Sequence, residues 1–324
     1  MRFRYVCRKT QGFESPRRQE KIHTTTFNFT DFIHFMDLLH PYWNLDILWR
    51  YGKVAPYLQD FLWTKEIASK IVWENFVLLE RGTKNPPVFI KDFNGIDENF
   101  LKLRANHHLD EVREQLSDKQ ILLRKYFVPR KLVNFFYACN NEYGNTMDRI
   151  FIDIDRQDNS ADNARKVTWE LIKIILSDKQ FTELIDYKPV ILRTWSSFHI
   201  YLLLKKNIDH IFYDTYLSYG KNKEQRFISK RAAEASKTTK LKVFAWHERK
   251  KWAIILDTSN TPPGKLARVP FSLHIKDSTT IDGIAVPISQ TELSDTKLIN
   301  KLQKLTPESI RKNREHYLSL LHDR

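Results

Sequence analysis

The sequence predicts an α/β (α+β) protein in which a mainly helical N-terminal region precedes a sheet-bearing core. Two patterns carry this prediction. Before residue 127, apolar residues recur three and four positions apart, which is typical of helices. After Pro129, short runs of β-branched and aromatic residues flank one amphipathic stretch, which is typical of strands packed on a helix.

Composition narrows the class of protein. The chain has 324 residues, of which 42% are apolar and 28% charged, as in folded soluble proteins. Lysine and arginine number 53 against 39 acidic residues, and this net charge of +14 favours a polyanionic partner such as nucleic acid or a nucleotide. No apolar run approaches the roughly 18 residues of a membrane span, and the first residues lack an apolar signal core. We therefore expect no membrane partner and a cytoplasmic or nucleoid location, or the host cytoplasm for a plasmid or viral protein.

Glycine and cysteine exclude several kinds of site. The eight glycines never fall into GxGxxG or GxxxxGK[ST] spacing, which excludes a Rossmann turn and a P-loop. The two cysteines, Cys7 and Cys139, are too far apart in the sequence for a disulfide framework or a zinc knuckle built on paired cysteines, so no zinc is expected.

We expect residues 1–128 to form the mainly helical N-terminal region. Its first 25 residues carry seven Lys or Arg against two Glu and form a basic arm or an edge hairpin. The aromatic-rich runs at 31–49 and 67–79 have helical spacing, and so does 98–126, which ends before Pro129.

Residues 129–290 form the predicted core, and 291–324 a helical C-terminal tail. In the tail, Thr306 and Pro307 suit the N-cap and first position of a helix. A stretch at 221–251 holds 11 Lys or Arg against three Glu. The core contains an expected helix at 164–176 and apolar strand candidates, namely LVNFFYA (132–138), DRIFIDID (148–155), VILRTW (190–195), FHIYLLL (198–204) and WAIILD (252–257).

Two carboxylates share one face of a predicted strand. In Ile150–Asp155 the isoleucines alternate with Asp153 and Asp155, so both acids lie on the face opposite the isoleucines. Like charges this close repel unless a cation lies between them, which suggests a divalent metal with oxygen ligands, Mg²⁺ or Mn²⁺. For an isolated Asp-x-Asp, the more common explanation is a strand end that enters solvent, where the acids begin a loop.

Three further segments hold candidate groups. Asp257 ends the strand Trp252–Asp257, His199 follows Ser197 where another strand begins, and Lys265–Lys276 gathers basic residues beyond them. Each has an ordinary structural interpretation by itself: an acid after a strand, a hydrogen-bonded core histidine and a basic surface strand.

The order of these segments resembles the archaeo-eukaryotic primase superfamily, and within it the small catalytic subunit. In that family a strand-borne Asp-x-Asp is followed by Ser-x-His and then by an apolar strand that ends in a third Asp. Here FIDID, Ser197-Phe198-His199 and ILD at Asp257 occur in that order. The segment ARVPFSLHIK, followed by Val286-Pro287-Ile288, is the most specific match. The resemblance covers about residues 130–290 and implies an antiparallel or mixed sheet of RNA-recognition-motif (RRM) topology flanked by helices.

The resemblance also implies roles for single residues. Asp153, Asp155 and Asp257 would be catalytic and would hold two Mg²⁺ or Mn²⁺ ions, while Ser197 and His199 would contact the triphosphate of the incoming nucleotide. A further set, Arg268, His274 and Lys276, matches nucleotide-binding positions on the opposite wall. This chain departs from the family by having only Phe198 between the serine and the histidine.

The implied function is that of a primase, or primase-polymerase, which makes short RNA or DNA primers on a template. Its partners would be single-stranded DNA template, primer and nucleoside triphosphates, and the resemblance leaves open a large primase subunit or a replication helicase. Two alternatives within the fold are a repair or translesion polymerase that extends existing ends and a non-catalytic nucleic-acid-binding subunit. A glycosyltransferase with an Asp-x-Asp motif would explain neither the charge excess nor PFSLHIK.

Overall fold

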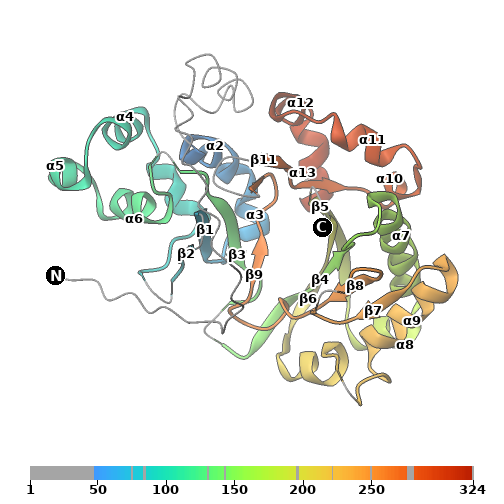
Figure 1. The fold of residues 1–324 in the computed structure, drawn as a ribbon. Coiled ribbons are helices and arrows are strands. Elements are labelled where there is room, and N and C mark those ends of the chain that lie inside the picture. The colour runs from blue at the N-terminus through green and yellow to red at the C-terminus, as the bar shows by residue number, and fades with distance from the viewer. Residues whose placement is uncertain are drawn as a thin grey trace, which may run out of the picture. The chain divides into compact units, whose positions relative to one another are not determined.

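The strands form two main sheets with helices around them, which confirms the α/β class with antiparallel and mixed sheets (Figure 1). The computed structural model describes residues 47–73, 76–82, 85–129, 131–141, 144–194, 197–220, 222–248, 250–275 and 281–322. The expected basic arm at 1–25 and most of the expected helix at 31–49 lie outside these residues. The described residues belong to one compact unit.

The larger sheet has six strands in the order β12-β5-β6-β4-β8-β7. All neighbours are antiparallel except β7 and β8, which are parallel. The succession β4–α7–β5–β6–α9–β8 is the β-α-β-β-α-β arrangement of ferredoxin-like and RRM folds. The bounds are β4 (Thr146–Asp155), α7 (Ala161–Ser177), α8 (Lys179–Leu184), β5 (Tyr187–Thr194), β6 (Ser197–Asp209), the π-helical turn η4 (Tyr213–Leu217), α9 (Phe227–Thr239), β7 (Val243–Ala245), β8 (Ile254–Asp257) and β12 (Val286–Ile288).

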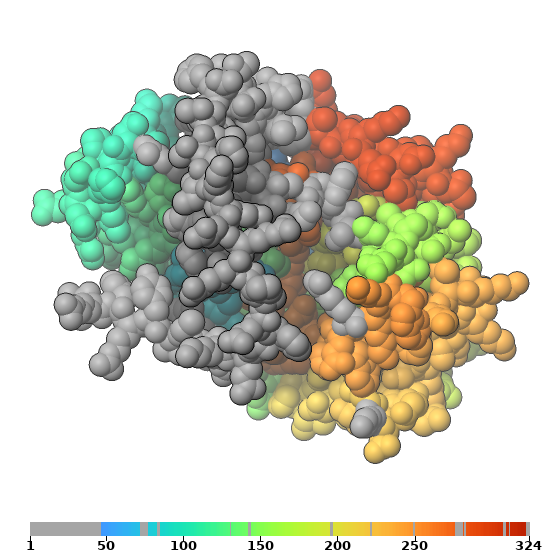
Figure 2. Space-filling view, in the orientation of Figure 1, coloured from blue at the N-terminus to red at the C-terminus, as the bar shows by residue number. Residues whose placement is uncertain are grey.

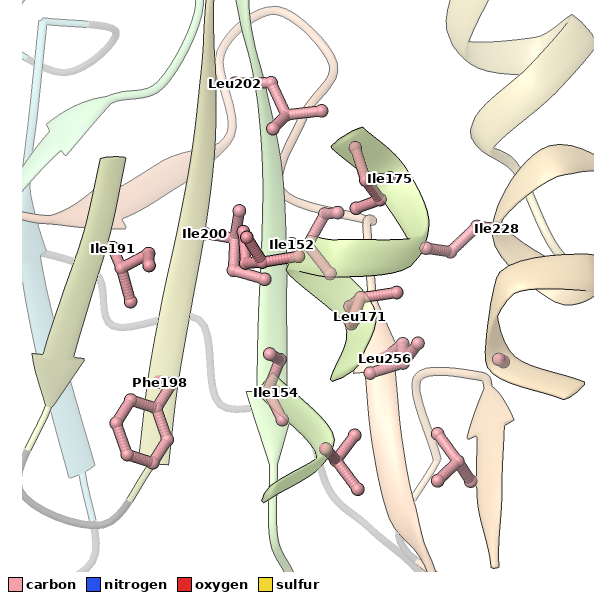
Figure 3. Packing of buried hydrophobic residues seen from close by; sticks show 14 of the residues in the cluster. Ile152, Ile154, Leu171, Ile175, Ile191, Phe198, Ile200, Leu202, Ile228 and Leu256 are labelled. Carbon is pink, nitrogen blue, oxygen red and sulfur yellow. The ribbon is translucent and has the colours of Figure 1, made fainter. Parts of the chain in front are cut away.

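One face of this sheet packs on α7 and α9. The isoleucines of β4 are fully buried there with Leu171 and Ile175 of α7 and Ile228 of α9 (Figure 3). Helix α7 begins after Ser160, whose hydroxyl accepts a hydrogen bond from the Asn163 amide at 3.1 Å. Because side chains alternate along a strand, burial of the isoleucines turns the polar residues of β4 to the opposite face.

The second sheet has four strands in the order β2-β1-β3-β9. Its main aromatic cluster brings Tyr51, Phe93, Phe127 and Phe135 together, with ring centroids 4.7 to 5.7 Å apart. The bounds of the sheet and of its surrounding helices are α2 (Ile47–Val54), η1 (Ala55–Leu58), α3 (Gln59–Leu62), β1 (Ile67–Trp73), β2 (Phe76–Glu80), η2 (Ile90–Gly95), α4 (Glu98–Asn106), α5 (Leu109–Val112), η3 (Arg113–Gln115), α6 (Asp118–Tyr126), β3 (Asn134–Ala138) and β9 (Leu266–Arg268).

The expected helix at 67–79 is wrong, because this segment forms the hairpin β1–β2. A short apolar run fits both the helical and the strand period, and Ile, Val and Trp favour strands. The strand conformation is selected by pairing with β3, which runs antiparallel to β1 from Ile67↔Tyr137 to Lys70↔Asn134. This pairing joins residues on both sides of the expected domain boundary at residue 128. The division into three domains stays a prediction.

The C-terminal segment returns to the larger sheet and then becomes helical. Figure 2 shows α7, in green, between the red C-terminal helices and the orange α9 segment. The expected cap is confirmed, since Thr306 Oγ1 accepts a hydrogen bond from the Ser309 amide and Pro307 is the first helical residue. The remaining bounds are β10 (Leu273–Ile275), β11 (Ile281–Ile284), α10 (Gln290–Ser294), α11 (Leu298–Gln303), α12 (Pro307–Lys312) and α13 (Arg314–His322). Across the described ranges, no helix has the length and apolar character to cross a membrane.

The two sheets contact each other through the face of the larger sheet that is opposite α7. The Tyr137 and Tyr201 rings stack with centroids 6.4 Å apart, and the Tyr201 hydroxyl donates a hydrogen bond to the Arg268 carbonyl at 3.4 Å. Arg149 on β4 reaches across to donate to the Phe61 carbonyl at 3.2 Å. The polar face of β4 therefore lies toward strands β3 and β9.

Candidate active site

Asp257, Asp153 and His199 lie in one row across the middle of the six-stranded sheet. Asp153 on β4 is paired with Asp257 on β8 and with His199 on β6. Paired residues of antiparallel strands project from the same face with Cβ atoms about 4.5–5.5 Å apart. Asp155 is two residues further along β4 and shares this face. The structure thus brings the expected acids and histidine together.

The three acids are crowded. Burial, together with the negative charges of Asp155 and Asp257, raises the pKa of Asp153 from 3.8 to about 8, although the positive charge of Arg268 opposes the rise. The carboxylate form of Asp153 is therefore disfavoured unless a proton or another positive charge is present. Its side chain retains 31% exposure, so it is reachable from solvent.

The other two carboxylates already accept hydrogen bonds. Asp155 accepts from the Gln157 amide at 3.0 Å and from its side-chain nitrogen at 2.7 Å. Asp257 Oδ1 accepts from the Tyr219 hydroxyl at 2.6 Å and from the Ser259 amide at 2.7 Å. Within the described part of the chain, no three His, Cys, Asp or Glu side chains are gathered as a ready-made metal site.

His199 is buried at the start of β6 and is neutral. Burial, together with the positive charges of Arg268 and His274, lowers the pKa of His199 to about 3. Its Nε2 lies 3.5 Å from Asp153 Oδ1, and its Nδ1 lies 3.5 Å from the Tyr201 hydroxyl. A neutral imidazole between an acid and a tyrosine can donate or accept a hydrogen bond without adding charge.

Ser197, the first residue of β6, is buried next to this row. Its hydroxyl has no hydrogen-bond partner among the residues described. Buried hydroxyls are normally paired, so an orphaned one marks a place where water or a ligand group completes the hydrogen bonding. This observation fits the ligand-contacting role that the family resemblance implies for Ser197, which stays a prediction.

The expected basic wall comes from the smaller sheet and the hairpin after it. Arg268 on β9 donates from Nη1 to Asn134 Oδ1 at 2.9 Å and to the Leu273 carbonyl at 3.0 Å, and its guanidinium lies 4.9 Å from the centre of the Phe136 ring. Burial lowers the pKa of Arg268, and the negative charge of Asp153 opposes this effect. The guanidinium is thus held in place near the row of acids.

Of the other two expected basic residues, the structure describes His274 but not Lys276. His274 lies on β10, is half-buried, and is close enough for its charge to lower the pKa of His199. Lys276 lies outside the described residues. The roles assigned to the whole set of site residues remain predictions, although the structure places the described members around one row.

Tyr219 is a residue of this site that the sequence did not reveal. Burial and the hydrogen bond to Asp257 raise the pKa of Tyr219, so its hydroxyl stays protonated and donates. It follows η4, 38 positions before Asp257 in the sequence, and no spacing rule connects the two. Only the folded chain brings this hydroxyl to the carboxylate.

Comparison with protein-family profiles and with curated sequences finds no match. Among solved structures, the chain is similar to the polymerase domain of Mycobacterium tuberculosis Ligase D, which was solved in complex with DNA. The TM-score is 0.52 at 12% sequence identity, and the alignment covers 84% of this chain and 91% of that domain. The two chains therefore share a fold, and the fold expected from the primase resemblance is also that of a polymerase domain.

Proposed function

We propose that this protein is a template-directed nucleotidyltransferase that joins nucleoside triphosphates into short RNA or DNA primers and releases pyrophosphate. The row of Asp257, Asp153 and His199, with Arg268 beside it, is the observation that carries the proposal. Two further observations support it: the fold shared with a polymerase domain that was solved with DNA, and a net charge of +14.

The acids suit divalent cations. Carboxylate oxygens are the ligands preferred by Mg²⁺ and Mn²⁺. The pKa of Asp153 is raised by burial and by the charges of Asp155 and Asp257, and a bound cation would offset both effects. Asp153, Asp155 and Asp257 would hold the ions after exchanging some of their present hydrogen bonds. Two such ions would supply activation of the primer 3′-hydroxyl and neutralisation of the leaving pyrophosphate.

The remaining residues would bind and orient the nucleotide. The orphaned Ser197 hydroxyl and the neutral His199 imidazole would donate hydrogen bonds to triphosphate oxygens. Arg268 would offset the triphosphate charge in a site without a glycine-rich phosphate loop, and His274 and Lys276 would add to it. A guanidinium already held by Asn134 would need little reorganisation when the nucleotide arrives.

A second candidate is a polymerase that only extends existing ends. The likeness to a polymerase domain from a ligase favours this candidate, whereas the PFSLHIK segment favours a primase. Incubation with single-stranded template, nucleotides and Mn²⁺ separates them. Short oligomers formed without a primer support a primase, and products that require an annealed primer support extension only.

The metal assignment is tested by substituting single acids. Asp153→Ala or Asp257→Ala should abolish incorporation and leave binding of single-stranded DNA intact. Asp158→Ala is the matched control, because this aspartate is exposed in the loop after β4. Incorporation at the wild-type rate by either of the first two variants would remove the assignment.

A further inference from the structure

An aromatic and basic surface lies at the edge of the six-stranded sheet, beyond β8. We call it the aromatic edge and define it by Phe244, Trp246, His247, Trp252, Lys242 and Lys250. Strand β7 is the last strand on this side of the sheet (Figure 1). Trp252 is 55% exposed and Phe244 38% exposed, and their rings meet edge to face with centroids 5.6 Å apart. Large exposed side chains gathered in this way mark interaction surfaces more often than isolated ones do.

Positive charge is interleaved with these rings. The Lys242 ammonium lies 4.4 Å from the centre of the Trp252 ring, and Lys250 lies 4.7 Å from Phe244 and 5.1 Å from Trp246. The surrounding stretch at 221–251 carries 11 Lys or Arg against three Glu. Such a combination of stacking faces and cations matches the bases and phosphates of a single nucleic-acid strand.

The aromatic edge shares a face with the row of acids. Phe244 pairs with Ile255, which pairs in turn with Asp155, so these three side chains project from the same side of the sheet. Two strand spacings, about 10 Å, separate Phe244 from Asp155 along this row. The Trp246 amide continues the ladder by donating to the Leu256 carbonyl at 3.2 Å.

Tyr219 connects the two features directly. Its hydroxyl donates to Asp257, and its ring stacks on His247 with centroids 5.7 Å apart, while His247 stacks on Trp246 at 5.8 Å. In the part of the chain that the structure describes, the buried indole N–H of Trp246 has no hydrogen-bond acceptor. A single nucleic-acid strand that stacks on these rings would reach the carboxylates without crossing another β-strand of the sheet.

We infer that the aromatic edge binds single-stranded nucleic acid by base stacking and guides that strand to the row of acids. Pairing of β7 with a second copy of the chain is the competing explanation. A strand of only three residues that directly follows Lys242 is poorly suited to such pairing. The inference deepens the proposed function by assigning a surface to the strand. Its test omits nucleotide and divalent cation, so either idea can fail while the other stands.

The test is fluorescence anisotropy with a labelled 15-nucleotide oligothymidine and with an abasic strand of the same length. Trp252→Ala should weaken oligothymidine binding about tenfold, and Trp252→Phe should retain most of the affinity, because a ring is kept. Binding of the abasic strand should be equal in wild type and both variants, since its phosphates contact only the cations. Trp63→Ala is the matched control, because Trp63 is 58% exposed and lies after α3.

Two kinds of result would overturn the inference. One is a failure of the binding pattern: either Trp252→Ala binds oligothymidine as tightly as Trp63→Ala does, or Trp252→Ala loses as much affinity for the abasic strand as for oligothymidine. The other is a dimer in sedimentation velocity that Trp252→Ala dissociates, which would assign the edge to contact between copies. Because both tryptophans are exposed, an unchanged thermal midpoint should confirm that the variants are folded.

Discussion

Replacing Asp153 by asparagine should stabilise the protein in the absence of divalent cations. Asparagine keeps the size and polarity of the side chain but removes the charge that burial disfavours and that Asp155 and Asp257 repel. A carboxyl whose pKa is raised in the folded state contributes its full stability below the unfolded value, near 3.8, and loses it as the pH rises toward about 8. The gain in the variant should therefore grow from pH 4 to about pH 8 and level off above it.

The size of the gain follows from the pKa of Asp153. A rise from 3.8 to about 8 corresponds to at most about 6 kcal/mol above pH 8. The side chain is 31% exposed and solvent screens part of the repulsion, so we expect about 1–3 kcal/mol.

Urea unfolding in EDTA across this pH range measures the difference, with Asp158→Asn as the exposed control. Added Mn²⁺ should raise the unfolding midpoint of the wild type and change that of Asp153→Asn much less. An Asp153→Asn variant no more stable than the wild type at pH 8.5 in EDTA would show that neither burial nor the neighbouring acids disfavour the charge of Asp153, and the argument for a cation site would fail.

Three other substitutions test separate parts of the structure. His199→Ala should raise the Michaelis constant for nucleotide several-fold with a smaller change in kcat; an unchanged constant would argue against triphosphate contact. Tyr219→Phe should raise the Mn²⁺ concentration for half-maximal incorporation about tenfold, since partners of metal ligands tune metal affinity, and an unchanged titration would exclude a positioning role. Asp148→Ala removes the carboxylate that pairs with the buried Lys65 ammonium at 2.6 Å. The free energy of unfolding, measured in urea, should fall by about 3 kcal/mol. Wild-type stability of this variant would mean that Lys65 is neutral in the folded protein.

The spacing of apolar residues predicts secondary structure correctly where it fits only the strand period or only the helix period. The alternation of Ile150–Asp155 predicted both the strand and the face of its acids, because one side of a strand in this sheet must be apolar to pack on α7. The prediction of a helix at 67–79 is wrong because the short apolar run there fits both the helical and the strand period. Only its pairing with β3, more than 50 positions further along the sequence, selects the strand.

Residue types and the two-residue repeat of a strand are enough to predict the α/β class, the basic character and the candidate acids on β4 and β8. Three features could be found only in the folded chain: Asp257 pairs with Asp153, Tyr219 reaches Asp257, and Phe244 and Trp246 continue the face of the acids. Register between strands distant in sequence is set by packing of the whole sheet, and no local pattern encodes it.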